Sequence, residues 1–217
     1  MGARGRPREF DREAVLRSAM GLFWERGYEG TSLSDLARAM GIASASIYAC
    51  FGDKESLFRE TVALYGTIAG EPPRRALSEK RTARAAIEAM LRATADSITR
   101  PDTPRGCMLI LAAPTGAIEN RRVRAFLAGL RRDMFSMIRD RLARGIADGD
   151  HAASPSSLDA IARYYTTVVQ GLSVQARDGA SRTELEAVIM CAMAAWDTLT
   201  SGGRRTGKRV SRRSSAP

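Results

Sequence analysis

The sequence predicts an all-α protein of about nine helices, divided into a small N-terminal domain and a larger C-terminal helical domain. Apolar residues recur three and four positions apart through most of the chain, which is the spacing of the buried face of an amphipathic helix. Polar residues suited to begin helices, such as Asp11 and Asp53, and glycines suited to end them, such as Gly27 and Gly41, separate these segments. With 217 residues and a hydrophobic content of 44%, the chain can bury a sizeable core.

The segment 31–54 predicts a helix-turn-helix. Its first helix has an apolar face, and Ser32 with Asp35 forms a plausible capping pair at its start. Gly41 can adopt the left-handed conformation that ends this helix, and Ser44 can cap a second helix that ends near Cys50. Two short helices joined by such a turn can lay the second helix in the major groove of DNA.

The outer surface of the second helix is suited to close contact with DNA. Its outward positions are small residues, Ser44, Ala45, Ser46 and Ala49. Serine hydroxyls can bond to bases or phosphates, and alanine can contact a thymine methyl group. Ile47 and Phe51 are expected to anchor the helix to the core. An ordinary helical hairpin is the alternative, because small residues also simply favour helices.

The residues around this segment carry a family resemblance. The pattern LF-x-x-x-G-Y-x-x-T-S begins at Leu22, and the pattern Y-x-x-F-x-x-K-E-x-L begins at Tyr48. This first quarter of the chain resembles the TetR family of bacterial transcriptional regulators. The resemblance implies phosphate contacts from Thr31, Tyr48 and Lys54, while Cys50 stands where the family often has His. The residues expected to contact double-stranded operator DNA are Arg6, Thr31, Ser32, Ser44, Ala45, Ser46, Tyr48, Ala49, Cys50 and Lys54.

The positive charge of the chain is unevenly placed. The net charge is +10, and residues 201–217 contribute +6 of it without an acidic residue. This Gly/Ser/Arg segment is expected to be a disordered, solvated tail, with non-specific DNA contact as the alternative. The N-terminal arm, residues 1–9, carries Arg4, Arg6 and Arg8 around Pro7. Such an arm can reach the minor groove or nearby phosphates, unless it is only a solvated terminus.

Several classes of protein are disfavoured by the sequence. No apolar run approaches the roughly 20 residues that span a bilayer, and the basic N-terminus lacks the apolar region of a secretory signal. Cys50, Cys107 and Cys191 are odd in number and far apart, which argues against a disulfide framework or a zinc site. His151 has no ligand cluster or nucleophile near it in sequence. We therefore expect a cytoplasmic protein that is not an enzyme and has no metal, cofactor or membrane partner.

The C-terminal part is expected to begin after a linker. A helix from Lys54 to about Gly70 should end before Glu71-Pro72-Pro73, where the prolines break it. The predicted units are an N-terminal arm 1–9, a helix-turn-helix domain 10–54, a connecting helix and linker 55–73, a ligand-binding and dimerisation domain 74–200, and the tail 201–217. Within the fourth unit, helices are predicted over 82–98, 106–113, 121–147 and 157–177, followed by a last helix that begins at a Ser181–Glu184 capping box.

The last two predicted helices suggest a homodimer. Both have broad apolar faces and are joined by a tight turn, which leaves more apolar surface than one protomer can cover. Pairing with a second copy as a four-helix bundle would bury it, and the TetR resemblance implies the same interface. The expected interface residues are Leu158, Ile161, Tyr165, Val169, Leu172, Leu185, Val188, Ala192 and Trp196.

The resemblance also implies a small-molecule effector site beside the short helix at 106–113. Flexible or aromatic side chains that could line it are Met90, Cys107, Met108, Phe126, Met134 and Tyr164. Residues of this kind that recur at helical spacing more often belong to the hydrophobic core than to a ligand site. Arg105 and a helix N-terminus would lower the pKa of Cys107 and make it a candidate sensor thiol, although a free cysteine is usually a small buried apolar residue.

These observations favour a homodimeric repressor that an unknown small-molecule effector releases from its operator. A ligand-independent or activating DNA-binding regulator is the alternative. An enzyme is disfavoured because no acid/base pair, metal cluster or phosphate-binding loop is assembled by the sequence.

Overall fold

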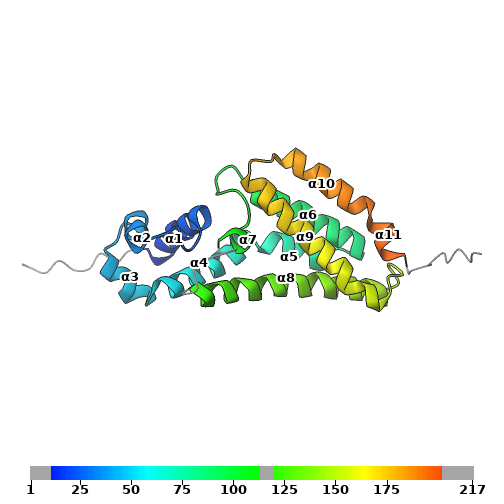
Figure 1. Ribbon diagram of the computed structural model, residues 1–217, viewed down its shortest axis with the longest axis horizontal. Coiled ribbons are helices and arrows are strands. Elements are labelled where there is room, and N and C mark those ends of the chain that lie inside the picture. Colours follow the sequence, from blue (N-terminus) through cyan, green and yellow to red (C-terminus); the bar gives the residue numbers. More distant parts are fainter. Residues whose placement is uncertain (1–10, 113–119, 202–217) are drawn as a thin grey trace, which may run out of the picture.

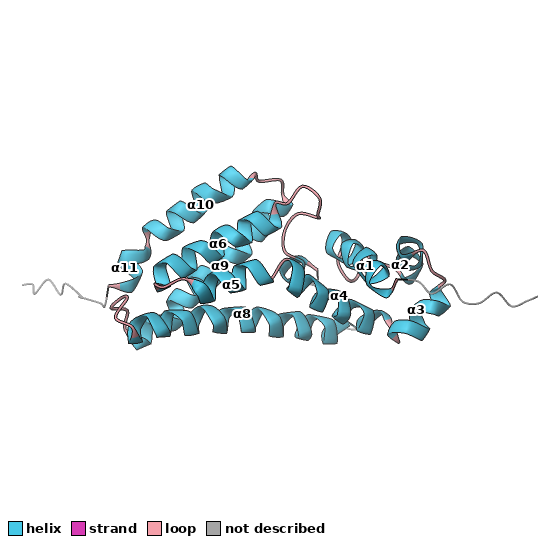
Figure 2. Ribbon diagram, turned by 180° about the vertical axis from the view of Figure 1, so that it is seen from behind, coloured by secondary structure: helices cyan, strands magenta, loops and turns pink. Residues whose placement is uncertain are grey.

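The computed structural model describes residues 11–112 and 120–201. These residues form helices and no strand, so the all-α prediction is confirmed (Figures 1 and 2). Arg6, with the rest of the N-terminal arm, lies outside the described residues, as does the tail beyond residue 201.

The N-terminal helices pack around an aromatic core. The ring of Phe23 meets that of Phe58 edge-on with centroids 5.1 Å apart, and Tyr28 meets Phe58 in the same way at 5.1 Å. Tyr28 thus packs in the turn after the first helix. The helices are α1 (Arg12–Arg26), α2 (Leu33–Met40), α3 (Ser44–Phe51) and α4 (Lys54–Ile68).

The caps of α2 and α3 confirm one prediction and correct another. Ser32 and Asp35 form a reciprocal capping box at the start of α2, and Gly41 ends the helix with φ 66° in the left-handed region. The N-cap of α3, however, is Ala43, which makes no side-chain hydrogen bond. The prediction that Ser44 caps α3 is wrong because Ser44 is already the first residue of the helix, which places its side chain in the first turn.

The expected linker after α4 is a helix. Helix α5 (Glu71–Glu79) begins three residues after α4 ends and contains both prolines in its first turn. Backbone N–H groups in the first turn of a helix have no intrahelical partner, so Pro72 and Pro73 remove no hydrogen bond there. The prolines end α4 and begin the next helix, and the chain continues into the C-terminal domain without a flexible connection.

The C-terminal helices follow the predicted pattern except at the end of the chain. Helix α8 has the predicted bounds, and the predicted last helix is two, because α10 ends at Ala194 and α11 follows it. In Figure 1, α8 runs along the bottom of the molecule, α9 crosses it, and α10 lies on the outer edge. The helices are α6 (Ala83–Ile98), α7 (Met108–Leu111), α8 (Arg121–Ala147), α9 (Leu158–Arg177), α10 (Arg182–Ala194) and α11 (Trp196–Thr200).

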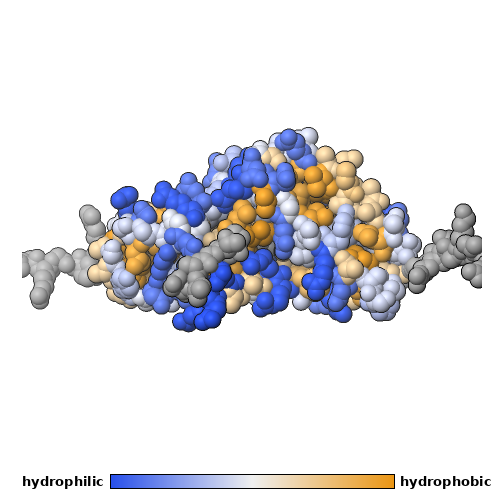
Figure 3. Space-filling view, viewed as in Figure 1, coloured by the Kyte–Doolittle hydropathy of each residue, from blue (hydrophilic) through white to orange (hydrophobic). Residues whose placement is uncertain are grey.

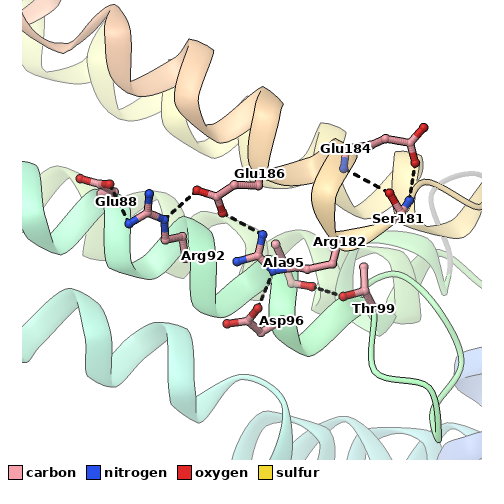
Figure 4. Close-up of polar contacts among 9 residues, drawn as sticks. All are labelled: Glu88, Arg92, Ala95, Asp96, Thr99, Ser181, Arg182, Glu184 and Glu186. Carbon is pink, nitrogen blue, oxygen red and sulfur yellow. Dashed lines mark hydrogen bonds and ion pairs between the residues drawn. The ribbon is translucent and has the colours of Figure 1, made fainter.

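Ion pairs fix the rotation of α10 against α6. Arg92 on α6 bonds to Glu186 on α10 at 2.9 Å, and Arg182 on α10 bonds to Asp96 on α6 (Figure 4). Beneath these pairs, Leu185 and other apolar residues of α10 are buried. The opposite face of α10 is consequently turned away from the protomer.

The protomer has two hydrophobic cores that meet at α7 and α8. One core belongs to α5, α6 and α8–α11, and the other to α1–α4. The second core also includes Met108 of α7 and Val123 and Leu127 of α8. Helices α1–α4 therefore pack directly on elements of the C-terminal domain.

Hydrogen bonds reinforce this junction at the C-terminal end of α1. The indole Nε1 of Trp24 donates to the carbonyl of Gly106 at 2.7 Å, and the backbone N–H of Tyr28 donates to the carbonyl of Ala112 at 2.9 Å. Arg177, at the end of α9, donates to the carbonyls of Trp24 and Glu25 at 2.8 and 2.9 Å. These bonds join α1 to the α7 region and to α9.

We expect Gly106→Ala to destabilise the protein more than Gly41→Ala. Both residues have positive φ, which costs alanine about 1 kcal/mol. At Gly41 a Cβ would meet nothing within 4 Å, whereas at Gly106 it would lie 2.8 Å from the carbonyl oxygen of Ser173. The free energy of unfolding in urea should fall by about 1 kcal/mol for Gly41→Ala and by roughly 3 kcal/mol for Gly106→Ala. Equal losses would contradict the close packing assigned to Gly106.

Candidate nucleic-acid interface

Helix α3 is held by its inner face and leaves its outer face open. Ile47 is 0% exposed and Phe51 is 5% exposed, so the predicted anchors are confirmed. The side chain of Tyr48 is an exposed large hydrophobic group, 51% exposed. The predicted contact residues that are exposed on α3 are Ser44, Ala45, Tyr48, Ala49 and Cys50, and Ser46 is half-buried. The arrangement leaves a low, mostly uncharged surface that a DNA groove can approach.

The α2–α3 turn sets the angle at which α3 projects. The N–H of Gly41 donates to the carbonyl of Arg38 at 3.3 Å, and the N–H of Ile42 donates to that of Ala37 at 3.2 Å. These bonds satisfy carbonyls at the end of α2 and require the left-handed glycine between them. The short α3 can therefore leave α2 at a sharp angle without losing backbone hydrogen bonds.

Ser32 has a structural role at the start of α2. Its hydroxyl accepts a hydrogen bond from the N–H of Asp35 at 3.1 Å, and the Asp35 carboxylate accepts one from the N–H of Ser32 at 3.1 Å. The Ser32 hydroxyl and the Ser32 N–H both donate to the Asp35 carboxylate, and these two bonds lower the pKa of Asp35. Ser32 is nevertheless exposed, so it remains a predicted contact at the N-terminal end of α2.

Thr31 is a correction to the predicted contact set. The residue is 0% exposed, and its hydroxyl donates to the carbonyl of Gly27 at 2.7 Å. It has no surface to offer DNA. Its local hydrogen bond ties the end of α1 to the start of α2, which gives a structural reason for a threonine at this position.

Lys54 lies at the start of α4, stacked on an aromatic ring. Its Nζ is 4.3 Å from the centroid of the Tyr28 ring, a cation–π contact. Burial lowers the pKa of Lys54. To reach a phosphate, the ammonium group has to leave this ring. The stem of the side chain is long enough to do so from its position in the first turn of α4.

The structure adds arginines that the sequence did not indicate. The Arg38 side chain at the end of α2 is 83% exposed. The Arg122 side chain is 82% exposed, and its Nε lies 3.6 Å from the carboxylate of Glu55 in the first turn of α4. The first turn of α8 contains no acidic residue, although cations are unfavourable at a helix N-terminus. The unfavourable arginines at the start of α8 could have been noticed in the sequence. Only the fold shows that Arg122 lies beside Glu55.

The predicted effector residues are not brought together. Met90 is buried in the C-terminal core and Met108 in the N-terminal core. Phe126 lies under the guanidinium of Arg59, 4.3 Å from its ring centroid. Met134 packs against the C-terminal core, and Tyr164 is exposed. These residues do not line one cavity, because their helical spacing reflects core packing in two separate clusters.

Cys107 does not have the environment expected of an activated thiol. Burial raises its pKa, the opposite of the predicted direction. Arg105 is turned elsewhere, because its guanidinium donates to the carbonyls of Ala176 and Ala180. The prediction that Arg105 lowers the pKa of Cys107 is therefore wrong.

The predicted dimer residues belong mostly to the protomer core. Tyr165 is 0% exposed, and among the predicted set Val188 alone is exposed, at 45%. The buried members are Leu158, Ile161, Tyr165, Val169, Leu172, Leu185, Ala192 and Trp196. The exposed apolar groups lie on the opposite faces of α9 and α10, and they are Tyr164, Val174, Val188 and Met190. Figure 3 shows hydrophobic residues gathered over α10.

Two further kinds of feature are absent from the described part of the chain. Residues 11–112 and 120–201 contain no group of three or more His, Cys, Asp or Glu side chains placed to hold a metal ion. No helix in these ranges is long and apolar enough to cross a membrane.

Comparison with known proteins identifies the family. Residues 15–61 match the family model described as bacterial regulatory proteins, tetR family. The HTH-type transcriptional repressor ComR of Escherichia coli (strain K12) is 34% identical over 205 residues, which cover 91% of this chain and 94% of ComR. The chain belongs to the TetR family. It is a DNA-binding transcriptional regulator, and the resemblance of its first quarter to that family is confirmed.

Two further similarities extend over most of this TetR-family chain. The HTH-type transcriptional repressor BdcR of Escherichia coli (strain K12) is 26% identical over 191 residues, covering 88% of this chain and 89% of BdcR. A cysteine mutant of the TetR family regulator CifR, solved with 26-bp double-strand operator DNA, is 45% identical with a TM-score of 0.84. The match covers 88% of this chain and 100% of the CifR chain.

We expect Lys54→Gln to weaken DNA binding at every sequence and to make it less dependent on salt. If Lys54 neutralises one phosphate, the slope of log K against log salt concentration should fall by about one. Lys80→Gln is the matched control, because it removes the same charge at an exposed position beyond α5. Fluorescence anisotropy across a salt series measures both slopes. An unchanged slope in Lys54→Gln would remove Lys54 from the contacts.

Proposed function

We propose that the protein is a homodimeric repressor that reads operator DNA with α3 of each protomer and is released by a small-molecule effector. The observation that carries the proposal is the outward face of α3, exposed on small residues while Ile47 and Phe51 anchor its inner face. The similar regulator CifR has been solved with operator DNA. In this family fold the exposed side of a helix-turn-helix is the surface available to the major groove.

Base and phosphate contacts can be assigned to different parts of this surface. Ser44, Ala45 and Ala49 are short enough for the backbone of α3 to approach base edges. Tyr48 and Lys54 flank them and supply contacts to the phosphate backbone, which fix position without reading sequence. The exposed Arg38 adds a positive charge at the end of α2.

A second copy of the chain is the partner that the exposed faces of α9 and α10 require. Met190 is 63% exposed, Val188 45% and Val174 43%. Grouped apolar exposure of this kind on a monomer marks an interaction surface. Pairing α9 and α10 with the same helices of a second protomer forms a four-helix bundle and carries two α3 helices on one particle.

Release follows from the spacing of those two helices. Half-sites in successive major grooves lie about 34–36 Å apart, so a change in the separation of the two α3 helices prevents simultaneous binding. An effector shifts this equilibrium only by its difference in affinity for the two states. The hydrogen bonds of Trp24, Tyr28 and Arg177 connect the α7 region and α9 to the end of α1.

The direct test is a footprint of the purified protein on the DNA upstream of its own gene. The wild-type protein should protect a site with two-fold symmetry. Ala45→Glu should abolish protection because it places a negative charge on the exposed face of α3. Ala152→Glu, at an exposed loop position in the C-terminal domain, is the matched control and should retain protection. Equal binding by the two variants would contradict reading by α3.

We expect Met190→Arg to split the dimer and leave the protomer folded. The residue is 63% exposed, so the charge interrupts only the surface between protomers. Ala192→Arg is the contrasting variant: Ala192 is 1% exposed, and arginine there should unfold the C-terminal core. Sedimentation velocity and circular dichroism distinguish the two results. A Met190→Arg protein that sediments as a dimer would move the interface elsewhere.

A further inference from the structure

We propose that the groove between α8 and α9 is the effector site and that it takes an organic oxyanion, a carboxylate or phosphate ester carried on an apolar body. This rests on the proposed function and names the chemical class of its ligand. The groove has a volume of about 610 Å³, within the range of ligand sites in proteins. In Figure 1, α9 crosses α8 near one end, and the two helices diverge toward the DNA-binding end.

The groove concentrates positive charge. Arg131 and Arg132 on α8 and Arg163 on α9 line it, and its lining contains no Asp or Glu. Among the described residues, none of these three guanidinium groups has a carboxylate within the 4.0 Å of an ion pair. Three like charges held in one concave surface repel one another, and a bound anion removes this cost.

Helix packing does not explain this charge. Where α8 and α9 are joined by an ion pair, Arg139 bonds to Asp159 at 2.7 Å, outside the groove. The two helices therefore use a compensated pair for attachment and leave the three arginines of the groove uncompensated. Burial lowers the pKa of Arg131, and the positive charge of Arg132 acts in the same direction.

The same surface offers the contacts of an amphipathic anion. The guanidinium of Arg163 lies 4.9 Å from the centroid of the Phe135 ring, so a cationic group stands beside an apolar wall. Ser136 also lines the groove, and its hydroxyl is an additional donor. Guanidinium groups and hydroxyls donate to oxyanions, while the Phe135 ring suits an alkyl or aryl portion.

The groove is connected to the helix-turn-helix through Arg131. Its Nη1 donates to the carbonyl of Leu109 in α7 at 2.9 Å. The next link is the carbonyl of Ala112, the C-cap of α7, which accepts from the N–H of Tyr28 at 2.9 Å. An oxyanion that binds Arg131 competes with Leu109 for the guanidinium. It can thereby change the position of α7 against the end of α1.

The first experiment measures binding without DNA, so that failure of the groove is separate from failure of the proposed function. Titration calorimetry on the full-length protein compares octanoate, octyl phosphate and octylammonium at constant ionic strength. The two anions should bind and the cation should not. The double variant Arg132→Gln/Arg163→Gln should lose at least tenfold in anion affinity, because both side chains reach into the groove. Arg144→Gln, exposed on α8 outside the groove, is the control and should bind as wild type.

The second experiment measures operator binding with and without octanoate. Octanoate should weaken operator binding by wild type and by Arg144→Gln but not by the double variant. All three proteins should bind the operator alike without the anion and should sediment as dimers. Absence of anion binding, equal anion binding by the double variant, unchanged operator affinity in octanoate, or dissociation of the double variant into monomers would each overturn the proposal. The last result would assign the arginines to the partner protomer instead.

Discussion

The hydrogen bonds between the C-terminal end of α1 and the C-terminal domain fix the position of the helix-turn-helix. Trp24, Tyr28 and Arg177 supply them, and each bond has a backbone carbonyl as acceptor. A carbonyl acceptor cannot be replaced by a change of side chain, so the contacts of Trp24 and Tyr28 depend on where the backbone of residues 106–112 lies. Gly106 is suited to this position because its neighbours leave no room for a Cβ. The positions of the α7 region and of the C-terminal end of α1 are therefore linked.

The same junction connects the short helix α3 to the C-terminal domain. Helix α3 contributes two buried anchors, Ile47 and Phe51, to a core that also contains Met108, Val123 and Leu127 of the C-terminal domain. A packed core transmits displacement because it has few voids to absorb it. Since α1 to α4 share one core, the anchors of α3 connect it to the C-terminal elements that belong to the same core.

Local features of the molecule could be predicted from the sequence, and contacts between distant segments could not. The capping box of Ser32, the turn at Gly41 and the bounds of α8 depend on residues within a few positions of one another. The burial of Thr31 depends on its bond to Gly27 and on packing that no periodicity shows. Likewise, the sequence predicts a break at Pro72 and Pro73, because only the structure shows that a new helix, α5, begins at these residues.

The interface that we propose between protomers lies on a different face of α9 and α10 from the one that periodicity selects. Helices α9 and α10 have apolar groups on two faces, one buried in the protomer and one exposed. The stronger stripe, with Leu172, Leu185 and Ala192, is the one that a spacing rule selects. It is stronger because it forms the core of the folded chain, whereas the weaker face is exposed. The ion pairs from α6 to α10, which decide between the two faces, join residues about ninety positions apart.

Charge placement along α8 links the two ends of the protein. Near its start Arg122 lies beside Glu55 at the DNA-binding end, and further along the helix Arg131 and Arg132 line the groove. Near its other end Arg141 is 3% exposed and donates to the carbonyls of Lys80 and Arg81, which holds the start of α6. Helix α8 thus places one arginine beside α4, two arginines in the groove and one in the core. Because these arginines lie on one helix of 27 residues, a single element connects the groove to the contact with Glu55 at the start of α4.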